Sequence, residues 1–289
     1  MNRSMLTGAL GATVLALGVA ACSGSSTGPG LTVSNTEITQ AITSDAGDAI
    51  ASSVDFMVSD EAAAGASASL VSGAPGVSAD VGPAVQASTA SANCTGPDGS
   101  GWYTCQDTTF RQLAVTRMIR FWEGTNYGLW WSANTDSVNY IATIGGSYTQ
   151  GWTPFRTVWV GRADTASMVV NRAASPVQHI WNRLGYRQDS TLVVSANVTK
   201  TWHYTAYDTA SAVTFDMPRS QYLWPQSGTI VHNMTVLFTA HSATQSFTKT
   251  VQRRAEVTFN GTQDVTLQVG GVTCTLDLMT HQVSNCTGT

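Results

Sequence analysis

The chain has 289 residues and a formal net charge of −4 at pH 7, with 11% charged and 43% hydrophobic residues. Typical soluble domains have about 25% charged residues, so Thr, Ser, Asn, Gln and Gly must provide much of the solubility here. A weakly acidic chain without a basic patch excludes nucleic acid as an expected partner.

The first predicted element is an export signal over residues 1–21. Arg3 precedes an apolar run that ends in Val19-Ala20-Ala21-Cys22, and small residues before a cut complete the usual layout of such a signal. With a cysteine at the cut, this stretch resembles the lipobox of bacterial lipoproteins. The resemblance implies a lipid on Cys22 and attachment to a membrane through it. An ordinary secretory signal cut after the same small residues is the alternative.

The lipoprotein resemblance also implies a location in the cell envelope. In Gram-negative sorting a serine after the lipidated cysteine, here Ser23, is compatible with the outer membrane. The periplasmic and the surface face both stay open. Because burial of two or more acyl chains gives stable attachment, the lipid alone would hold the protein on the membrane.

Residues 22–93 are predicted to form a lipidated acidic arm. It begins with a flexible Gly/Ser/Thr/Pro tether over residues 23–30. Ser34 and Glu37 have the spacing of a capping box, with Glu37 reaching back to the start of the helix, and apolar residues follow at helical spacing. These features predict a helix over about residues 35–58.

The rest of the arm is predicted to be a long flexible linker. Residues 62–93 are almost entirely Ala, Ser, Gly, Val and Pro, a composition that buries too little apolar surface to offset its ordering entropy. No Lys or Arg occurs between Arg3 and Arg111, whereas the arm is rich in Asp and Glu. Its acids could dock on a basic partner or a cation, or simply make a soluble spacer.

Residues 94–289 are predicted to form an antiparallel β domain. Apolar and polar residues alternate most clearly at 191–204 and at 229–239, each of which is interpreted as one strand with a buried face. Turns are indicated at Gly145-Gly146, Asn260-Gly261 and Gly270-Gly271. Ten to thirteen strands are expected, so the fold class is mainly β: a meander forming a curved sheet, half-barrel or sandwich, with one N-terminal helix.

Four cysteines remain once Cys22 is lipidated, and an even number in an exported protein predicts two disulfides. Hairpin symmetry pairs Cys94 with Cys105 and Cys274 with Cys286. The sequence has no C-x-x-C pair and no nucleotide-binding or zinc-protease fingerprint. No metal and no cofactor are therefore expected.

An aromatic cluster and one histidine are the candidate functional residues. Trp122, Tyr127, Trp130 and Trp131 surround a turn and could form a platform for a sugar, lipid or protein, unless the fold covers both faces of these rings. His232 interrupts the apolar row of 229–239. Beside Asp208 or Asp216 it could act as a general base, or it could be a hydrogen-bonded core residue.

The expected function is that of a lipid-anchored envelope lipoprotein whose β domain binds or scaffolds. Its expected partners are the membrane and an envelope protein, glycan or lipid ligand. The competing class is an extracytoplasmic hydrolase that uses His232 or His203 with a carboxylate. An apolar cavity lined by Trp favours binding, a polar cleft that unites His232 with an Asp favours hydrolysis, and a fully packed interior favours a scaffold.

Overall fold

The computed structural model of the chain describes residues 34–68, 93–108, 113–129, 131–150, 155–195 and 197–288. These described residues form one compact unit. The predicted signal, Cys22, the tether and residues 69–92 of the predicted linker lie outside the described residues. Among the residues described, no helix is long and apolar enough to cross a membrane.

Helix α1 (Asn35–Ala68) begins where the sequence predicts and ends later. The Glu37 N–H donates a hydrogen bond of 3.0 Å to Ser34 Oγ, which is the capping half of the predicted box. The Glu37 carboxylate contacts Lys200 of the sheet. The end predicted at residue 58 is wrong because the next ten positions are rich in alanine, the best helix former, which the prediction took as linker composition.

Every strand in the described residues belongs to one open antiparallel sheet, so the predicted meander is confirmed and no two-sheet sandwich forms. Consecutive strands pair, except that β3 pairs with both the short β4 and β5. The strands are β1 (Asn93–Thr95), β2 (Tyr103–Thr108), β3 (Ala114–Glu123), β4 (Asn126–Gly128), β5 (Ser137–Gln150), β6 (Phe155–Asn171), β7 (Gln178–Val194), β8 (Val198–Asp216), β9 (Ser227–Ser242), β10 (Ser246–Thr258), β11 (Asp264–Val269), β12 (Val272–Asp277) and β13 (Gln282–Gly288).

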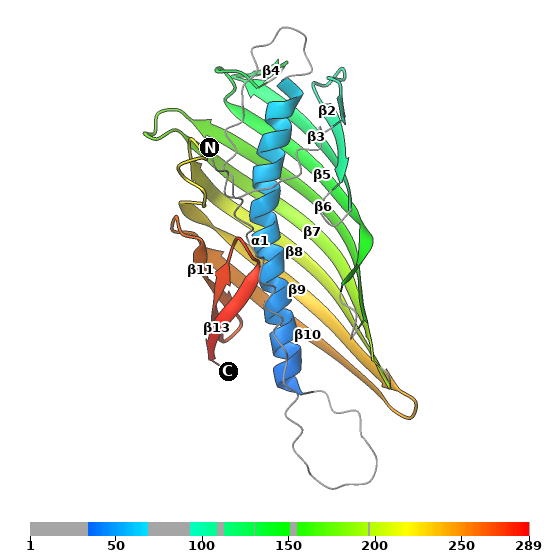
Figure 1. The fold of residues 1–289 in the computed structure, drawn as a ribbon. Helices are drawn as coiled ribbons and strands as arrows, with labels where there is room; N and C mark the ends of the chain where they lie inside the picture. Colours follow the sequence, from blue (N-terminus) through cyan, green and yellow to red (C-terminus); the bar gives the residue numbers. More distant parts are fainter. Residues whose placement is uncertain are drawn as a thin grey trace, which may run out of the picture. The chain divides into compact units, whose positions relative to one another are not determined.

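The long strands β5 to β10 curve around α1, which runs along the inside of the sheet (Figure 1). The helix has 34 residues and is therefore about 51 Å long. Strands of 13 to 19 residues are roughly 43–63 Å long, so helix and strands match in length. The main core lies inside this curl, where the inner face of the sheet packs against Ile38, Ile42, Ile50, Val54 and Met57 of the helix.

The stretch 191–204 is two strands, so its prediction as one strand is wrong. Strand β7 ends at Val194 and β8 begins at Val198, and the Ser195 N–H donates to the Val198 carbonyl at 2.9 Å. The alternation places apolar residues such as Val194 inside and polar residues such as Thr191 outside, but Thr191 is buried and Val194 is exposed. The apolar alternation continues across the hairpin turn, and this continuity concealed the turn.

Gly145 and Gly146 do not form the predicted turn, because β5 continues through both. Gly146 has a φ of 144°, and a Cβ atom there would lie 3.1 Å from a side-chain carbon of Leu113. The glycine permits a close approach within a continuous strand. The other two predicted turns, at Asn260-Gly261 and Gly270-Gly271, are confirmed as the connections from β10 to β11 and from β11 to β12.

Both predicted disulfides are present. Cys94–Cys105 joins β1 to β2, where the two residues are directly opposed in register. Cys274–Cys286 joins β12 to β13 beside an irregularity in their register. Two disulfides are typical of an oxidising, extracytoplasmic compartment.

Candidate functional site

A stripe of polar side chains crosses the inner face of the sheet from β6 to β9. The register places Arg162 of β6 directly beside Arg187 of β7. Two residues along each strand lies a second row of register partners, one from each of β6, β7, β8 and β9: Asp164, Gly185, Asp208 and His232. The curved sheet therefore has a band of polar and charged side chains across its inner face.

Gly185 makes room for two carboxylates in this stripe. A Cβ atom at Gly185 would overlap the Asp164 carboxylate and lie 3.3 Å from Asp208 Cβ. Asp164 uses the space to form an ion pair with Arg183, and both side chains are buried. The absence of a side chain at residue 185 thus allows the acids of β6 and β8 to share the inner face.

The acidic residues of α1 contact basic side chains of the β domain. Each of the six acids in the described helix has such a partner: Glu37 with Lys200, Asp45 with Arg187 at 3.0 Å, Asp48 and Asp55 with His281 at 3.1 and 2.9 Å, Asp60 with Arg117 at 2.7 Å, and Glu61 with His179 at 2.7 Å. The sequence offered a basic partner or a solvated spacer as their role. These acids instead bind the helix to its own sheet.

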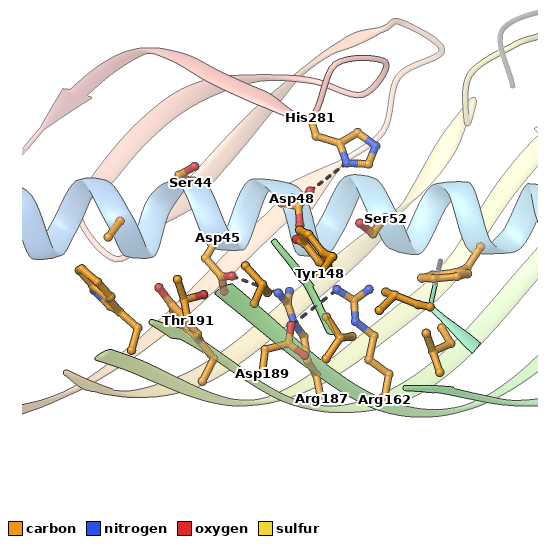
Figure 2. Close-up of a pocket in the computed structure, with 18 of the residues that line it drawn as sticks. Ser44, Asp45, Asp48, Ser52, Tyr148, Arg162, Arg187, Asp189, Thr191 and His281 are labelled. Atoms are coloured by element: carbon orange, nitrogen blue, oxygen red, sulfur yellow. Dashed lines mark hydrogen bonds and ion pairs between the residues drawn. The ribbon is translucent and has the colours of Figure 1, made fainter. Parts of the chain in front are cut away.

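A cavity of about 520 Å³ lies between α1 and the inner face of β5 to β8 (Figure 2). One wall is apolar and consists of Leu113, Ile144, Val158 and Val160, which belong to a second hydrophobic cluster that also packs on Phe56 and Tyr148. The other wall carries Asp45, Asp48, Arg162, Arg187, Asp189 and His281. Its volume is within the range of small-molecule sites, about 300–1,000 Å³.

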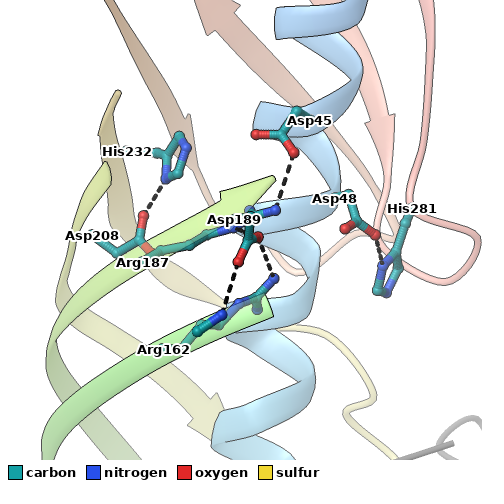
Figure 3. A network of polar contacts seen from close by, with 9 residues as sticks. Asp45, Asp48, Arg162, Arg187, Asp189, Asp208, His232 and His281 are labelled. Carbon is teal, nitrogen blue, oxygen red and sulfur yellow. Dashed lines mark hydrogen bonds and ion pairs between the residues drawn. The ribbon is translucent and has the colours of Figure 1, made fainter. Parts of the chain in front are cut away.

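The two arginines of the cavity are compensated unequally (Figure 3). Arg187 contacts both Asp189 and Asp45. Arg162 reaches Asp189 only at 3.7 Å, which is an ion pair but longer than a hydrogen bond. Its Nε atom is buried and has no hydrogen-bond partner among the residues that the structure describes.

The pKa values of Arg187 and Arg162 differ in the same sense as their contacts. Burial lowers the pKa of Arg187, but Asp45 and Asp189 outweigh it and raise the pKa above its usual value. Burial lowers the pKa of Arg162 and the charge of Arg187 lowers it further, and these two effects outweigh Asp189, Asp48 and Asp164, which raise it. Burial also raises the pKa of Asp45 against the opposing effect of Arg187. Of the two arginines, Arg162 is therefore the one whose charge the neighbouring carboxylates compensate less.

His281 lies between two carboxylates of the helix. Its Nδ1 atom is 3.1 Å from Asp48 and its Nε2 atom is 2.9 Å from Asp55. Burial lowers its pKa, but the two carboxylates outweigh that effect and raise it to about 9. A protonated His281 at neutral pH thus ties the turn between β12 and β13 to α1.

His232 and Asp208 contact each other inside the sheet, which was one of the pairings allowed by the sequence. Burial raises the pKa of Asp208, but the hydrogen bond with His232 outweighs it and lowers the pKa. The His232 side chain has no exposed surface, and neither residue lines the cavity. His203 is exposed on the outer face, and Asp216 accepts a hydrogen bond from Gln178.

The predicted aromatic cluster is divided between two places. The Trp122 and Tyr127 rings lie 4.8 Å apart, and the guanidinium of Arg120 lies within 4.8 and 5.3 Å of them. Trp131 packs against His179 near the main core, with ring centroids 5.5 Å apart. Trp130 lies outside the described residues. The ring faces at Trp122 and Tyr127 are thus partly occupied by the protein's own arginine.

Sequence reasoning missed the charged interior of β7. Arg183, Arg187 and Asp189 are buried, whereas Leu184 between them is 62% exposed. An apolar residue is normally assigned to the inside, so the strand gives the wrong orientation when read alone. The available signal was the charge of two elements together: acids on one helix, and two arginines four residues apart on one face of one strand.

Comparison of the chain with protein-family models, with curated proteins and with solved structures finds no significant match.

Proposed function

We propose that this protein is a lipid-anchored lipoprotein of the cell envelope that binds a small amphipathic molecule between α1 and the sheet. The observation that carries the proposal is the cavity of about 520 Å³ with one apolar and one charged wall. Small-molecule sites combine an apolar lining with a few polar groups that orient the ligand. An interior packed throughout would have favoured a scaffold.

Two valines of strand β6 provide a matched pair of substitutions that tests binding in the cavity. Val160 lines the cavity, whereas Val169 on the same strand is 45% exposed on the outer face. We expect the parent protein to bind the neutral fluorophore N-phenyl-1-naphthylamine. Val160→Trp should weaken this binding at least tenfold, and Val169→Trp should leave it unchanged, because only the first fills the cavity.

Fluorescence titration measures these affinities, and near-UV circular dichroism checks the fold of each variant. Ser52→Leu fills the cavity from the helix and provides a second variant if Val160→Trp does not fold. Absence of binding by the parent, or equal binding by Val160→Trp and Val169→Trp, would contradict the proposal.

The anchor is supported by the lipobox resemblance around Cys22 and by the compartment that the two disulfides indicate. We expect the membrane-extracted parent to carry a lipid mass on residue 22, and Cys22→Ala to leave the membrane fraction. Intact mass spectrometry and fractionation measure both. Equal membrane retention of the two proteins with no lipid on the parent rules the anchor out. If the lipid is found, separation of the inner and outer membranes tests the outer-membrane location.

The contact between His232 and Asp208 is the one observation that favours the alternative, an extracytoplasmic hydrolase. Against it, His232 has no exposed surface through which a substrate could reach the ring. Hydrolysis of p-nitrophenyl butyrate distinguishes the two functions. A rate above background that is lost in His232→Gln would favour the hydrolase, and equal background rates favour binding.

A further inference from the structure

The cavity contains a charged group whose interactions are incomplete. The Arg162 side chain is 12% exposed, and its ion pair with Asp189 spans 3.7 Å. Its Nε atom is buried without a partner among the described residues. Buried charges in proteins are normally paired and hydrogen-bonded. Because Arg162 also lines the cavity, its guanidinium is placed to meet a group that enters there.

The neighbouring charges do not fill this need. Asp189 is in closer contact with Arg187, which also pairs with Asp45 at 3.0 Å. Asp48 on the cavity wall pairs with His281. Each of these acids thus has its closest printed contact with Arg187 or His281, and among the described residues Arg162 keeps only the 3.7 Å ion pair with Asp189.

The apolar wall starts directly beside this guanidinium. Ile144 of β5 is the register partner of Arg162, and Val160 lies on the same face of β6 two residues away. The Phe56 ring of the helix is 5.8 Å from the guanidinium. An elongated ligand with an acidic group at one end would meet the cation and the apolar surface at the same time.

We propose that the ligand is an amphipathic anion, a carboxylate or a phosphate monoester on an apolar chain, with its acidic group on Arg162 and its chain along Ile144, Val158 and Val160. This inference rests on the proposed binding function and adds the chemical class of the ligand. Arginine suits the role because its planar donors match carboxylate and phosphate oxygens.

A head-group series with one chain length tests the inference on the full-length protein. Dodecanoate, dodecyl phosphate, dodecan-1-ol and dodecyltrimethylammonium each compete with N-phenyl-1-naphthylamine at pH 7.5, below their aggregation concentrations. We expect at least one of the two anions to compete about tenfold better than the alcohol, and the cation to compete no better than the alcohol. Dodecanoate and dodecyl phosphate together show whether the natural head group is a carboxylate or a phosphate.

Variants of Arg162 test whether this residue causes the preference for anions over the alcohol. Arg162→Gln should remove the preference for the anions, so that the anions and the alcohol compete within about twofold of one another in this variant. Arg162→Lys, which keeps the charge, should retain part of the preference and serves if the glutamine variant does not fold. Arg253→Gln is the matched control, because Arg253 is an exposed arginine of β10 that does not line this cavity.

The outcomes separate the two proposals. If the fluorophore and the alcohol bind but the parent shows no preference for an anion, or if Arg162→Gln retains the preference, the role of Arg162 is overturned and the cavity function stands. If neither the fluorophore nor any amphiphile binds, the cavity function itself fails. Preferential binding of dodecyltrimethylammonium would also overturn the proposal that the ligand is an anion.

Discussion

At the scale of single residues, the unusual feature is the number of charges that the sheet encloses. Arg117, Arg183, Arg187 and Asp189 are each at most 5% exposed. Burying ions costs several kcal/mol each unless partners compensate, and removal of one partner of a buried pair typically costs about 3–5 kcal/mol. The positions that allow this pairing should therefore tolerate little change.

Gly185 is the sharpest example. We expect Gly185→Ala to lower the free energy of unfolding by about 1–3 kcal/mol, because the new methyl group displaces the Asp164 carboxylate from Arg183. Gly145→Ala is the control within a strand, since a Cβ there has its nearest contact at 3.9 Å. Urea unfolding with intact disulfides measures both variants. Equal stabilities of the two would show that Asp164 can move without cost.

At the scale of elements, the long helix docks at two different distances. Its Cα atoms come close to β9, β10, β11 and β13. Between the helix and strands β6 and β7 the backbones are further apart, and long side chains such as Arg187 reach across to the helix. The cavity lies in this space. The close side depends on Gly47, where a Cβ atom would overlap a methyl group of Val283 and lie 3.2 Å from Leu276.

Gly47 therefore provides a test of the close docking. Glycine to alanine in a helix normally gains about 1 kcal/mol, but here we expect Gly47→Ala to destabilise the protein by about 1–3 kcal/mol through overpacking. Adding Val283→Ala should restore part of the loss, because it removes the overlapping methyl group. Chemical unfolding of the two single variants and the double variant forms the cycle. Additive effects would contradict a direct contact between these two residues.

At the scale of the whole molecule, acid–base pairs distributed along α1 connect it to strands and turns that are distant in sequence. Asp45 and Arg187 are 142 residues apart, and Asp48 and His281 are 233 residues apart. These pairs give the fold a dependence on pH. His281 is the clearest case, because Asp48 and Asp55 raise its pKa to about 9 against the effect of burial.

The direction of this dependence follows from linkage. A histidine whose pKa is raised from about 6.5 to about 9 on folding contributes its full stability below pH 6.5 and loses it as the pH rises to 9. We expect the free energy of unfolding of the parent to fall between pH 6.5 and 9. The free energy of unfolding of His281→Gln should fall less over the same interval. The exposed His203 supplies the control variant, His203→Gln, which should keep the parent slope. Identical slopes for parent and His281→Gln would contradict the pairing.

The sequence by itself was sufficient for features that depend on neighbouring residues. The Ser34 cap, the alternation at 229–239, the glycine turns around β11 and both disulfides follow from local spacing, and all are observed. Together with the strand count they determine a mainly antiparallel β meander with one helix. Local spacing could also mislead: the alternation at 191–204 concealed a hairpin, and the alanines after Val58 continued the helix.

Only the tertiary structure decided which face of β7 lies inside and what the acids of the helix contact. Leu184 and Arg187 both belong to β7, and the face that carries the arginine is buried because Asp45 and Asp189 compensate the charge there. Compensation of the Arg187 charge by Asp45 depends on residues brought together from distant parts of the chain, so no local sequence pattern predicts it. The cavity beside Arg162 has the same origin, since it exists only where the curved sheet stands away from the helix.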